Sequence, residues 1–275
     1  MRAFGERLAA AVAAHGTLCV GIDPHAPLLA EWGLTDDADG LARFAAACVE
    51  ALAGHVAVVK PQSAFFERHG SRGIAVLEDL LAAFAGTGTL TLLDVKRGDI
   101  GSTMDGYADA YLAAGAPLGA DAVTLSPYLG FGSLAPALDA AADAGRGVFV
   151  LARTSNPEGA EVQLAAHGGR SVAQSMVDGA AARNAATRNG AAAPLGSVGI
   201  VVGATHEHGL ALSALHGPVL APGLGAQGAG PADIRARFAD VAGVVLPSAS
   251  RSVLRTGPDP VALRAAAARL RDELA

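Results

Sequence analysis

A chain of 275 residues suffices for one α/β barrel or two small domains, and a hydrophobic content of 51% supports a large core and argues against extensive disorder. The formal net charge of −6 disfavours a protein that binds nucleic acid or an anionic membrane surface. Residues 1–16 lack a signal-peptide pattern and no later apolar run reaches the roughly 18 residues of a spanning helix, so we expect no membrane partner.

Eight short apolar runs recur along the chain, separated by stretches with helical character. They are nearly continuously apolar and rich in β-branched residues, which is typical of parallel strands covered on both faces. The runs comprise residues 18–23, 56–60, 90–95, 121–125, 147–152, 198–202, 218–221 and 243–246. A repeat of about 34 residues indicates a (β/α)8 TIM barrel, and we predict an α/β fold with residues 1–275 as a single domain. A doubly wound open sheet, which shares the alternation, is the alternative.

The Ala- and Leu-rich segments between the runs are predicted to be helices, most of them ending at a glycine: residues 37–54, 73–86, 132–145 and 171–190. The interval 153–196 exceeds one helix and two turns, so we expect residues 156–169 to form an excursion over the barrel mouth. Cys19 and Cys48 lie in apolar runs, which predicts buried free thiols and a cytoplasmic location.

The two lysines of the chain both occur where a predicted strand ends. The other 18 of the 20 basic residues are arginines, which cannot release a proton near neutral pH, whereas a lysine can. Lys60 ends the second strand, Lys96 follows the third, and Asp23 ends the first. Because a β/α barrel builds its active site at the carboxyl ends of its strands, we predict the site there.

The third strand ends in the sequence Asp94-Val95-Lys96-Arg97-Gly98-Asp99. Side chains alternate along a strand, so Asp94 and Lys96 are expected to point into the mouth together, where their charged groups can touch. The carboxylate favours the charged ammonium, and Asp99 on the following loop can flank it from another side. This arrangement predicts a fixed positive charge with a transferable proton; a structural ion-pair network is the alternative.

The loops after the last two strands are suited to a phosphate group. Residues 222–228 contain three glycines, and Arg251 follows the eighth strand. Glycines let backbone N–H groups approach an anion, and the arginine fork can bind two of its oxygens. The glycines also match the dinucleotide pattern Gly-x-Gly-x-x-Gly, but the next strand lacks an acidic residue for the ribose, so we reject a nicotinamide site. His206 and His208 lack further partners at metal-ligand spacing, so we assign no metal.

These strand ends together resemble the orotidine 5′-phosphate decarboxylase family over most of the chain. The pattern Asp-x-Lys-x-x-Asp occurs as Asp94, Lys96 and Asp99. Sugar-phosphate lyases share a similar core, but the wider set fits the decarboxylases: Asp23 before Pro24, Lys60 before Pro61, Ile100, Thr103, Ser155 before Asn156-Pro157, Gln227 and Arg251 before Ser252. The chain looks like the longer variant of the family, with an extended segment after the fifth strand.

The resemblance implies decarboxylation of orotidine 5′-monophosphate to uridine 5′-monophosphate in pyrimidine synthesis, without metal or organic cofactor. It implies that Lys96 stabilises a ring carbanion and then protonates it, roles that suit an ammonium group. The remaining roles follow from the family: Asp94 beside Lys96, Asp23 and Lys60 on the ribose, Ser155 on the pyrimidine, Gln227 and Arg251 on the phosphate, and Asp99 and Thr103, which flank Ile100, reaching into the partner's site of a homodimer. A one-residue shift would exchange Thr154 for Ser155.

Two alternatives remain at this point. A sugar-phosphate aldolase would use Lys60 or Lys96 as a Schiff-base nucleophile, but such a lysine must be neutral, and neighbouring carboxylates oppose this. The second alternative is a binding protein and not an enzyme: a barrel that keeps the phosphate-binding loops but has no catalytic activity.

Overall fold

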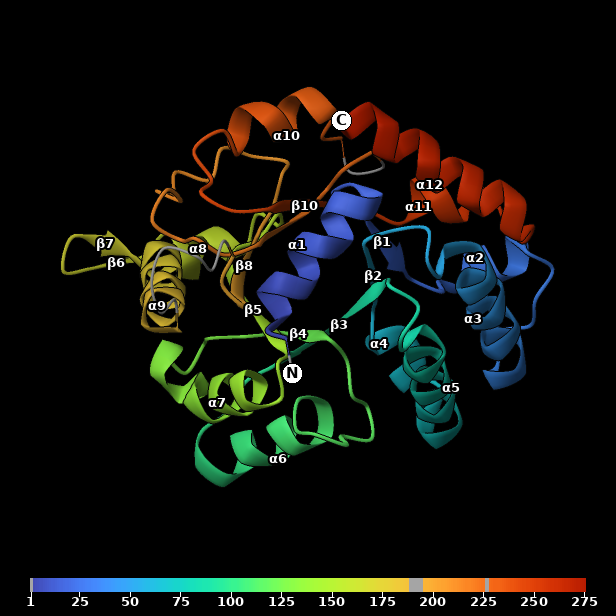
Figure 1. Ribbon diagram of the computed structural model, residues 1–275, viewed down its shortest axis with the longest axis horizontal. Helices are drawn as coiled ribbons and strands as arrows, with labels where there is room; N and C mark the ends of the chain where they lie inside the picture. The colour runs from blue at the N-terminus through green and yellow to red at the C-terminus, as the bar shows by residue number, and fades with distance from the viewer. Residues whose placement is uncertain (1, 188–194, 226–227) are drawn as a thin grey trace.

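The computed structural model describes residues 2–187, 195–225 and 228–275, and its centre is a closed barrel of eight parallel strands (Figure 1). The strands lie in the order β1-β10-β9-β8-β5-β4-β3-β2. Their bounds are β1 Cys19–Ile22, β2 Val58–Pro61, β3 Leu90–Arg97, β4 Ala122–Leu125, β5 Gly147–Arg153, β8 Val198–Val202, β9 Val219–Pro222 and β10 Val245–Ala249. This closure confirms the predicted TIM barrel and excludes the open sheet, which would have two free edges.

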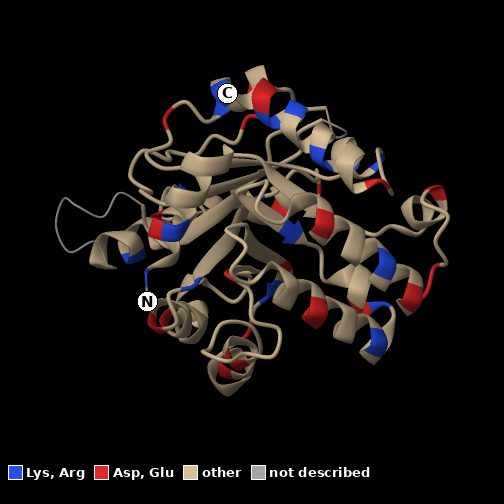
Figure 2. Ribbon diagram, turned by 45° about the vertical axis from the view of Figure 1, so that its right-hand side comes forward, with Lys and Arg blue, Asp and Glu red and all other residues tan. Residues whose placement is uncertain are grey.

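Most of the helices around the barrel bury one apolar face against it. In α3, for example, Leu41, Phe44, Cys48 and Leu52 are buried at helical spacing, and Asp37 caps the helix by accepting the N–H of Gly40. The helices are α1 Phe4–His15, α2 Ala26–Glu31, α3 Ala38–Leu52, α4 Ala64–Glu67, α5 Gly70–Phe84, α6 Gly101–Tyr111, α7 Ala135–Asp143 after the 3-10 turn η1 Phe131–Leu134, α8 Gly159–Gln163, α9 Val172–Thr187, α10 Pro231–Arg237, α11 Arg251–Leu254 and α12 Pro260–Leu274. Charged residues of both signs are spread over this outer layer (Figure 2).

Helix α1 closes the amino-terminal end of the barrel, across which it lies in Figure 1. Its Phe4 and Leu8 are buried in one cluster with the inward-facing side chains of the strands. Phe4 meets Phe149 edge to face, with ring centroids 6.1 Å apart, and Gly147 at the start of β5 leaves room for the Phe4 ring. Apolar side chains therefore fill the barrel interior at this end, whereas the charged strand-end residues lie at the other end.

Two segments depart from regular alternation. Residues 156–169 do form an excursion, with α8 and a hairpin of β6 Ala166–His167 and β7 Arg170–Ser171, but the hairpin projects sideways from the barrel instead of crossing its mouth (Figure 1). Residues 203–218, between β8 and β9, contain no helix. They form a loop in which Leu212 and Leu215 are buried, so this loop provides the apolar contacts that a helix would otherwise make.

Candidate active site

Four charged side chains from three neighbouring strands meet at the carboxyl end of the barrel. The Lys96 ammonium lies 2.7 Å from Asp94 Oδ2, and the Lys60 ammonium lies 3.4 Å from the same oxygen. Lys60 is also 3.9 Å from Asp23 Oδ1. The structure thus brings together Asp23, Lys60, Asp94 and Lys96, as the positions of these residues at strand ends predicted.

Asp94 is the centre of this group. It is 6% exposed, and both carboxylate oxygens are hydrogen-bonded: Oδ2 accepts from Lys96 and from Gln62 Nε2 at 2.8 Å, and Oδ1 accepts from Thr124 Oγ1 at 2.6 Å. Burial alone would raise the pKa of Asp94, but the charges of Lys60 and Lys96 and the hydrogen bonds lower it to about 2. Asp94 is therefore ionised throughout the physiological range.

Lys96 reaches Asp94 through an irregularity in β3. Its backbone has a φ of 47°, and the pairing of β3 with β4 shifts register between Leu93 and Arg97. The Lys96 N–H donates to Thr124 Oγ1 at 3.0 Å, which holds the bent backbone. Strict side-chain alternation therefore fails at Lys96, although the predicted contact with Asp94 is present. Positive φ costs a non-glycine residue free energy, and such strain concentrates at functional sites.

Lys60 is almost fully enclosed, being 7% exposed. Burial favours the neutral amine, but Asp23 and Asp94 outweigh it and raise the pKa of Lys60 above its usual value. By contrast, the Lys96 side chain is 47% exposed and faces open space. The two lysines therefore differ in exposure: Lys60 is a nearly enclosed charge in the cavity wall, whereas Lys96 is half-exposed.

A cavity of about 310 Å³, here called the Lys96 cavity, lies above this charged group. Ser155, Thr154 and Gly203 line it together with Lys96. The Thr154 hydroxyl is already engaged, since it donates to Asn156 Oδ1 and accepts from Gln163 Nε2, both at 2.7 Å. No described residue hydrogen-bonds to the Ser155 hydroxyl, which leaves Ser155 the freer of the two for a ligand.

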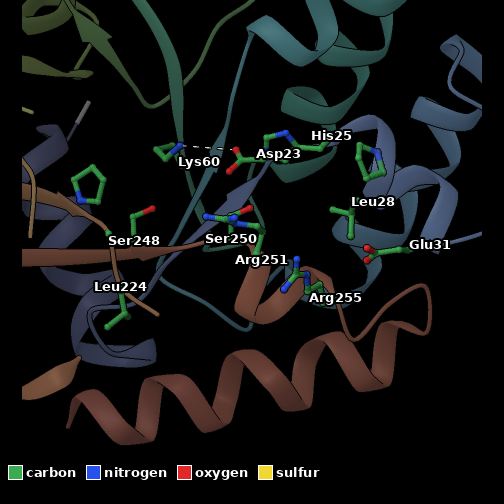
Figure 3. Close-up of a pocket in the computed structure, with 13 residues that line it drawn as sticks. Asp23, His25, Leu28, Glu31, Lys60, Leu224, Ser248, Ser250, Arg251 and Arg255 are labelled. Carbon is green, nitrogen blue, oxygen red and sulfur yellow. Dashed lines mark ion pairs between the residues drawn. The ribbon is translucent and has the colours of Figure 1, made fainter. Parts of the chain in front are cut away.

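A second cavity of about 480 Å³, the Arg251 cavity, adjoins the first at Asp23 and Lys60. Figure 3 shows Asp23 and Lys60 on one side of it and Arg251 and Arg255 on the other. Asp23 Oδ1 and Ser250 Oγ are buried polar atoms without a hydrogen-bond partner among the described residues, and both residues line this cavity. Such atoms need partners, so the cavity is suited to a ligand that carries hydroxyl or phosphate oxygens.

The glycine loop after β9 and the start of α11 form one wall of the Arg251 cavity. A side chain on Gly225 would come within 2.5 Å of Ser252 Oγ, so the two predicted phosphate loops do touch. Gly223 and Gly225 have positive φ values of 119° and 76°, which glycine adopts without strain. Gln227, which we also predicted to bind phosphate, lies outside the described residues.

Asp99, Ile100 and Thr103 lie apart from the charged group, at the start of α6. The Asp99 carboxylate accepts the N–H of Ile100 at 2.8 Å, and no ion pair within 4.0 Å joins it to Lys96. The expectation that Asp99 flanks Lys96 is therefore not met within one chain. Ile100 is 62% exposed, and Thr103 is exposed as well.

Thr124 and Gln62 are the site residues to which the sequence analysis gave no role. Thr124 bonds both the Asp94 carboxylate and the Lys96 backbone, so it orients the pair. A polar residue near the end of an otherwise apolar strand was the signal that could have found it.

His208, considered above as a metal ligand, uses both ring nitrogens on backbone groups of Arg237 and Leu210. Within the described ranges, no helix is both long and apolar enough to cross a membrane.

Comparison with known proteins identifies the family. Residues 16–266 match the family model described as Orotidine 5'-phosphate decarboxylase / HUMPS family. The chain belongs to this family. It is 61% identical over 272 residues to the orotidine 5′-phosphate decarboxylase of Salinispora arenicola, covering 98% of this chain and 96% of that protein. With the Streptomyces coelicolor orotidine 5′-phosphate decarboxylase the identity is 56% over 279 residues, covering 100% and 98%.

The fold of this family member agrees with a solved relative. A crystal structure from Streptomyces avermitilis matches with a TM-score of 0.93 and 55% sequence identity, covering 100% of this chain and 95% of that one. The decarboxylases named among the relatives are carboxy-lyases. The comparisons therefore confirm the predicted enzyme class, a carboxy-lyase.

The depressed pKa of Asp94 predicts a pH-dependent stability. Because the pKa falls from 3.8 to about 2 on folding, ionised Asp94 stabilises the protein above about pH 4, and this contribution is lost as the pH falls toward 2. Urea unfolding at pH 5, 4 and 3 should show a shallower loss of stability in Asp94→Asn than in the parent chain. Carbon-13 NMR titration of the Asp94 carboxyl provides a second reading, and a midpoint near 4 would contradict the prediction.

Proposed function

We propose that the chain decarboxylates orotidine 5′-monophosphate to uridine 5′-monophosphate and carbon dioxide, in pyrimidine nucleotide synthesis, with Lys96 as the proton donor. The observation that carries the proposal is the Lys96 ammonium held 2.7 Å from a buried carboxylate at the edge of a ligand-sized cavity. The names of relatives that are 56–61% identical support the substrate.

The reaction breaks the bond between the pyrimidine ring and its carboxylate. Carbon dioxide leaves, and the electron pair of the broken bond stays on the ring carbon. The Lys96 ammonium stabilises this developing charge and then transfers a proton to the carbon, forming uridine 5′-monophosphate. The amine regains its proton from solvent, which its half-exposed position permits.

Asp94 and Lys60 position this proton donor. Asp94 holds the Lys96 ammonium through a charge-assisted hydrogen bond, and Thr124 fixes the carboxylate from its other side. Lys60 balances the charge of Asp94 and, with Asp23, presents polar groups for ribose hydroxyls. Asp23 Oδ1 accepts no hydrogen bond from a described residue, which supports that role.

We place the rest of the nucleotide in the two neighbouring cavities. Ser155 in the Lys96 cavity has a free hydroxyl for the pyrimidine edge, and Arg251 in the adjoining cavity provides a guanidinium for the phosphate. Gln227 is included in the phosphate site by resemblance. Binding at the phosphate, remote from the reacting carbon, can contribute to catalysis by holding the ring against Lys96.

A Schiff-base aldolase is the competing activity on this barrel. It requires a neutral lysine, and the raised pKa of Lys60 between Asp23 and Asp94 is the reverse of that requirement. The direct test is the ultraviolet absorbance of orotidine 5′-monophosphate incubated with the protein, which should change to that of the product. An unchanged spectrum, or a covalent adduct trapped by borohydride with a sugar phosphate, would refute the proposal.

Replacing the proton donor should abolish most of the turnover. Lys96→Arg keeps the positive charge, but a guanidinium does not release its proton and its planar fork does not fit the place of an ammonium, so kcat should fall at least about 10²-fold. Steady-state kinetics measure the effect, with Arg43→Lys on the exposed face of α3 as a control that retains full activity. Near-parental turnover of Lys96→Arg would exclude proton donation by Lys96.

Removing the phosphate contact should weaken binding. Arg251→Ala deletes a charged hydrogen bond and should reduce affinity for uridine 5′-monophosphate by about 1.5–3 kcal/mol. Calorimetric titration measures the loss, and Arg269→Ala, an exposed arginine on α12, is the matched control. Equal affinity of Arg251→Ala and the parent chain would move the phosphate site elsewhere.

A homodimer completes the proposed site. Ile100, Tyr128 and Leu129 are large apolar side chains, 62%, 80% and 52% exposed, on the loops after β3 and β4, which a hydrogen bond from Ser126 N to Arg97 O joins. A second copy that covers this patch would also bring Asp99 and Thr103 toward the neighbouring site.

The oligomeric state can be tested at this patch. Ile100→Asp places a charge on the apolar patch, so sedimentation velocity should show a shift from dimer to monomer and activity should fall with it. Val261→Asp, at a residue 69% exposed on α12, should leave both unchanged. A monomeric parent chain would contradict the dimer.

A further inference from the structure

A separate cavity lies at the opposite end of the barrel from the candidate active site. It has a volume of about 710 Å³, compared with about 480 Å³ for the Arg251 cavity. Its walls are helix α1 and the loops that precede β3, β4 and β5. Since parallel strands start at one end of a barrel and finish at the other, this cavity cannot be part of the site at the strand ends. We call it the Arg146 cavity.

The described lining of the Arg146 cavity carries an excess of positive charge. Three arginines, Arg2, Arg7 and Arg146, line it together with one carboxylate, Asp121. That carboxylate is already occupied: it forms an ion pair with Arg7 and accepts hydrogen bonds from the N–H and hydroxyl of Thr91 at 2.8 and 3.1 Å. No ion pair within 4.0 Å joins Arg2 or Arg146 to a described residue, so neither of these charges is neutralised by direct contact.

Arg146 is held in place in spite of this missing partner. Its Nη1 donates to the carbonyls of Tyr111 and Ala120 at 2.7 and 3.1 Å, whereas Nη2 and Nε have no acceptor among the described residues. The guanidinium lies against Gly119, where a side chain would come within 2.8 Å of both Nη atoms. Burial lowers the pKa of Arg146; Asp121 opposes this shift and Arg7 adds to it. An anion beside Arg146 would relieve the cost of this half-buried charge.

The size and the remaining lining of the cavity indicate what kind of anion fits. Ala10, Ala14 and Ala85 provide exposed apolar surface beside the arginines. Inorganic phosphate would occupy only a small part of the space and would leave this apolar surface exposed. The guanidinium fork matches phosphate oxygens in pairs, and apolar walls favour an organic group attached to the phosphate.

We propose that the Arg146 cavity is a second ligand site that binds a small organic phosphate, with its anionic group on Arg146 and Arg2 and its organic group against the exposed alanines of α1 and Ala85. The proposal does not depend on the activity assigned to the other end of the barrel. Because Phe4 and Leu8 of α1 pack on the inward-facing strand residues, occupancy of the Arg146 cavity also stabilises the closed end of the barrel.

Phenyl phosphate is a suitable probe because it lacks the ribose hydroxyls expected to contact Asp23 and Lys60. Isothermal titration of the full chain should show a phenyl phosphate site whose affinity does not change when Arg251, in the cavity at the strand ends, is replaced by alanine. Arg146→Gln should weaken the affinity at least about tenfold, the scale of one charged hydrogen bond, and Arg2→Gln should weaken it less. Arg43→Gln, at an exposed residue on α3, should bind like the parent.

Two further measurements make the result decisive. Arg2 is exposed, so Arg2→Gln keeps the test open if Arg146→Gln fails to fold, which circular dichroism reports. Titration with benzyl alcohol, a neutral probe, should show no binding. Absence of phenyl phosphate binding to the parent chain, or equal affinity in the parent and both arginine variants, overturns the second site. A failure of nucleotide binding at the strand ends would instead concern the proposed decarboxylase activity, because the comparison among the Arg146 variants remains valid.

Discussion

The buried carboxylate of Asp94 organises the carboxyl end of this barrel. Removing an ionised carboxylate from water is costly unless partners replace its hydration. Here two ammonium groups, an amide and a hydroxyl do so, and they come from β2, β3, β4 and the turn after β2. The same contacts that make Asp94 tolerable in the interior also fix the direction of the Lys96 ammonium. Stability and the orientation of the Lys96 ammonium therefore share one set of bonds.

The inward-facing residues of the barrel change from apolar to charged along its axis, and the apolar part supports the charged group around Asp94. In β3 the inward-facing positions run from Leu90 and Leu92, which belong to the apolar cluster beneath α1, to Asp94, which belongs to the site. The apolar floor excludes water from below, so the electrostatic interactions above it are stronger than they would be in solvent. The net charge of the whole chain is −6. Even so, Lys60, Lys96 and Arg251 line cavities at the carboxyl end, while many carboxylates lie on the outer helices (Figure 2).

Sequence reasoning failed in informative places. Alternation of side chains along a regular strand placed Lys96 beside Asp94, and the contact is present, but β3 bends there and Lys96 adopts a positive φ. The bend depends on Thr124, which is 28 residues away in the sequence and adjacent in space. The general alternation of strands and helices also breaks at residues 203–218, which bury Leu212 and Leu215 without forming a helix.

The sequence by itself determined the barrel and the identity of the strand-end residues, because periodic burial is a local property and parallel closure gathers all strand ends at one face. The similarity to known decarboxylases was also readable from those residues. Only the tertiary structure decided which oxygens of Asp94 each donor takes, that Ser155 is freer than Thr154, and that Asp99 makes no contact with Lys96 within one chain. These outcomes depend on distances between side chains far apart in sequence, which no local pattern encodes.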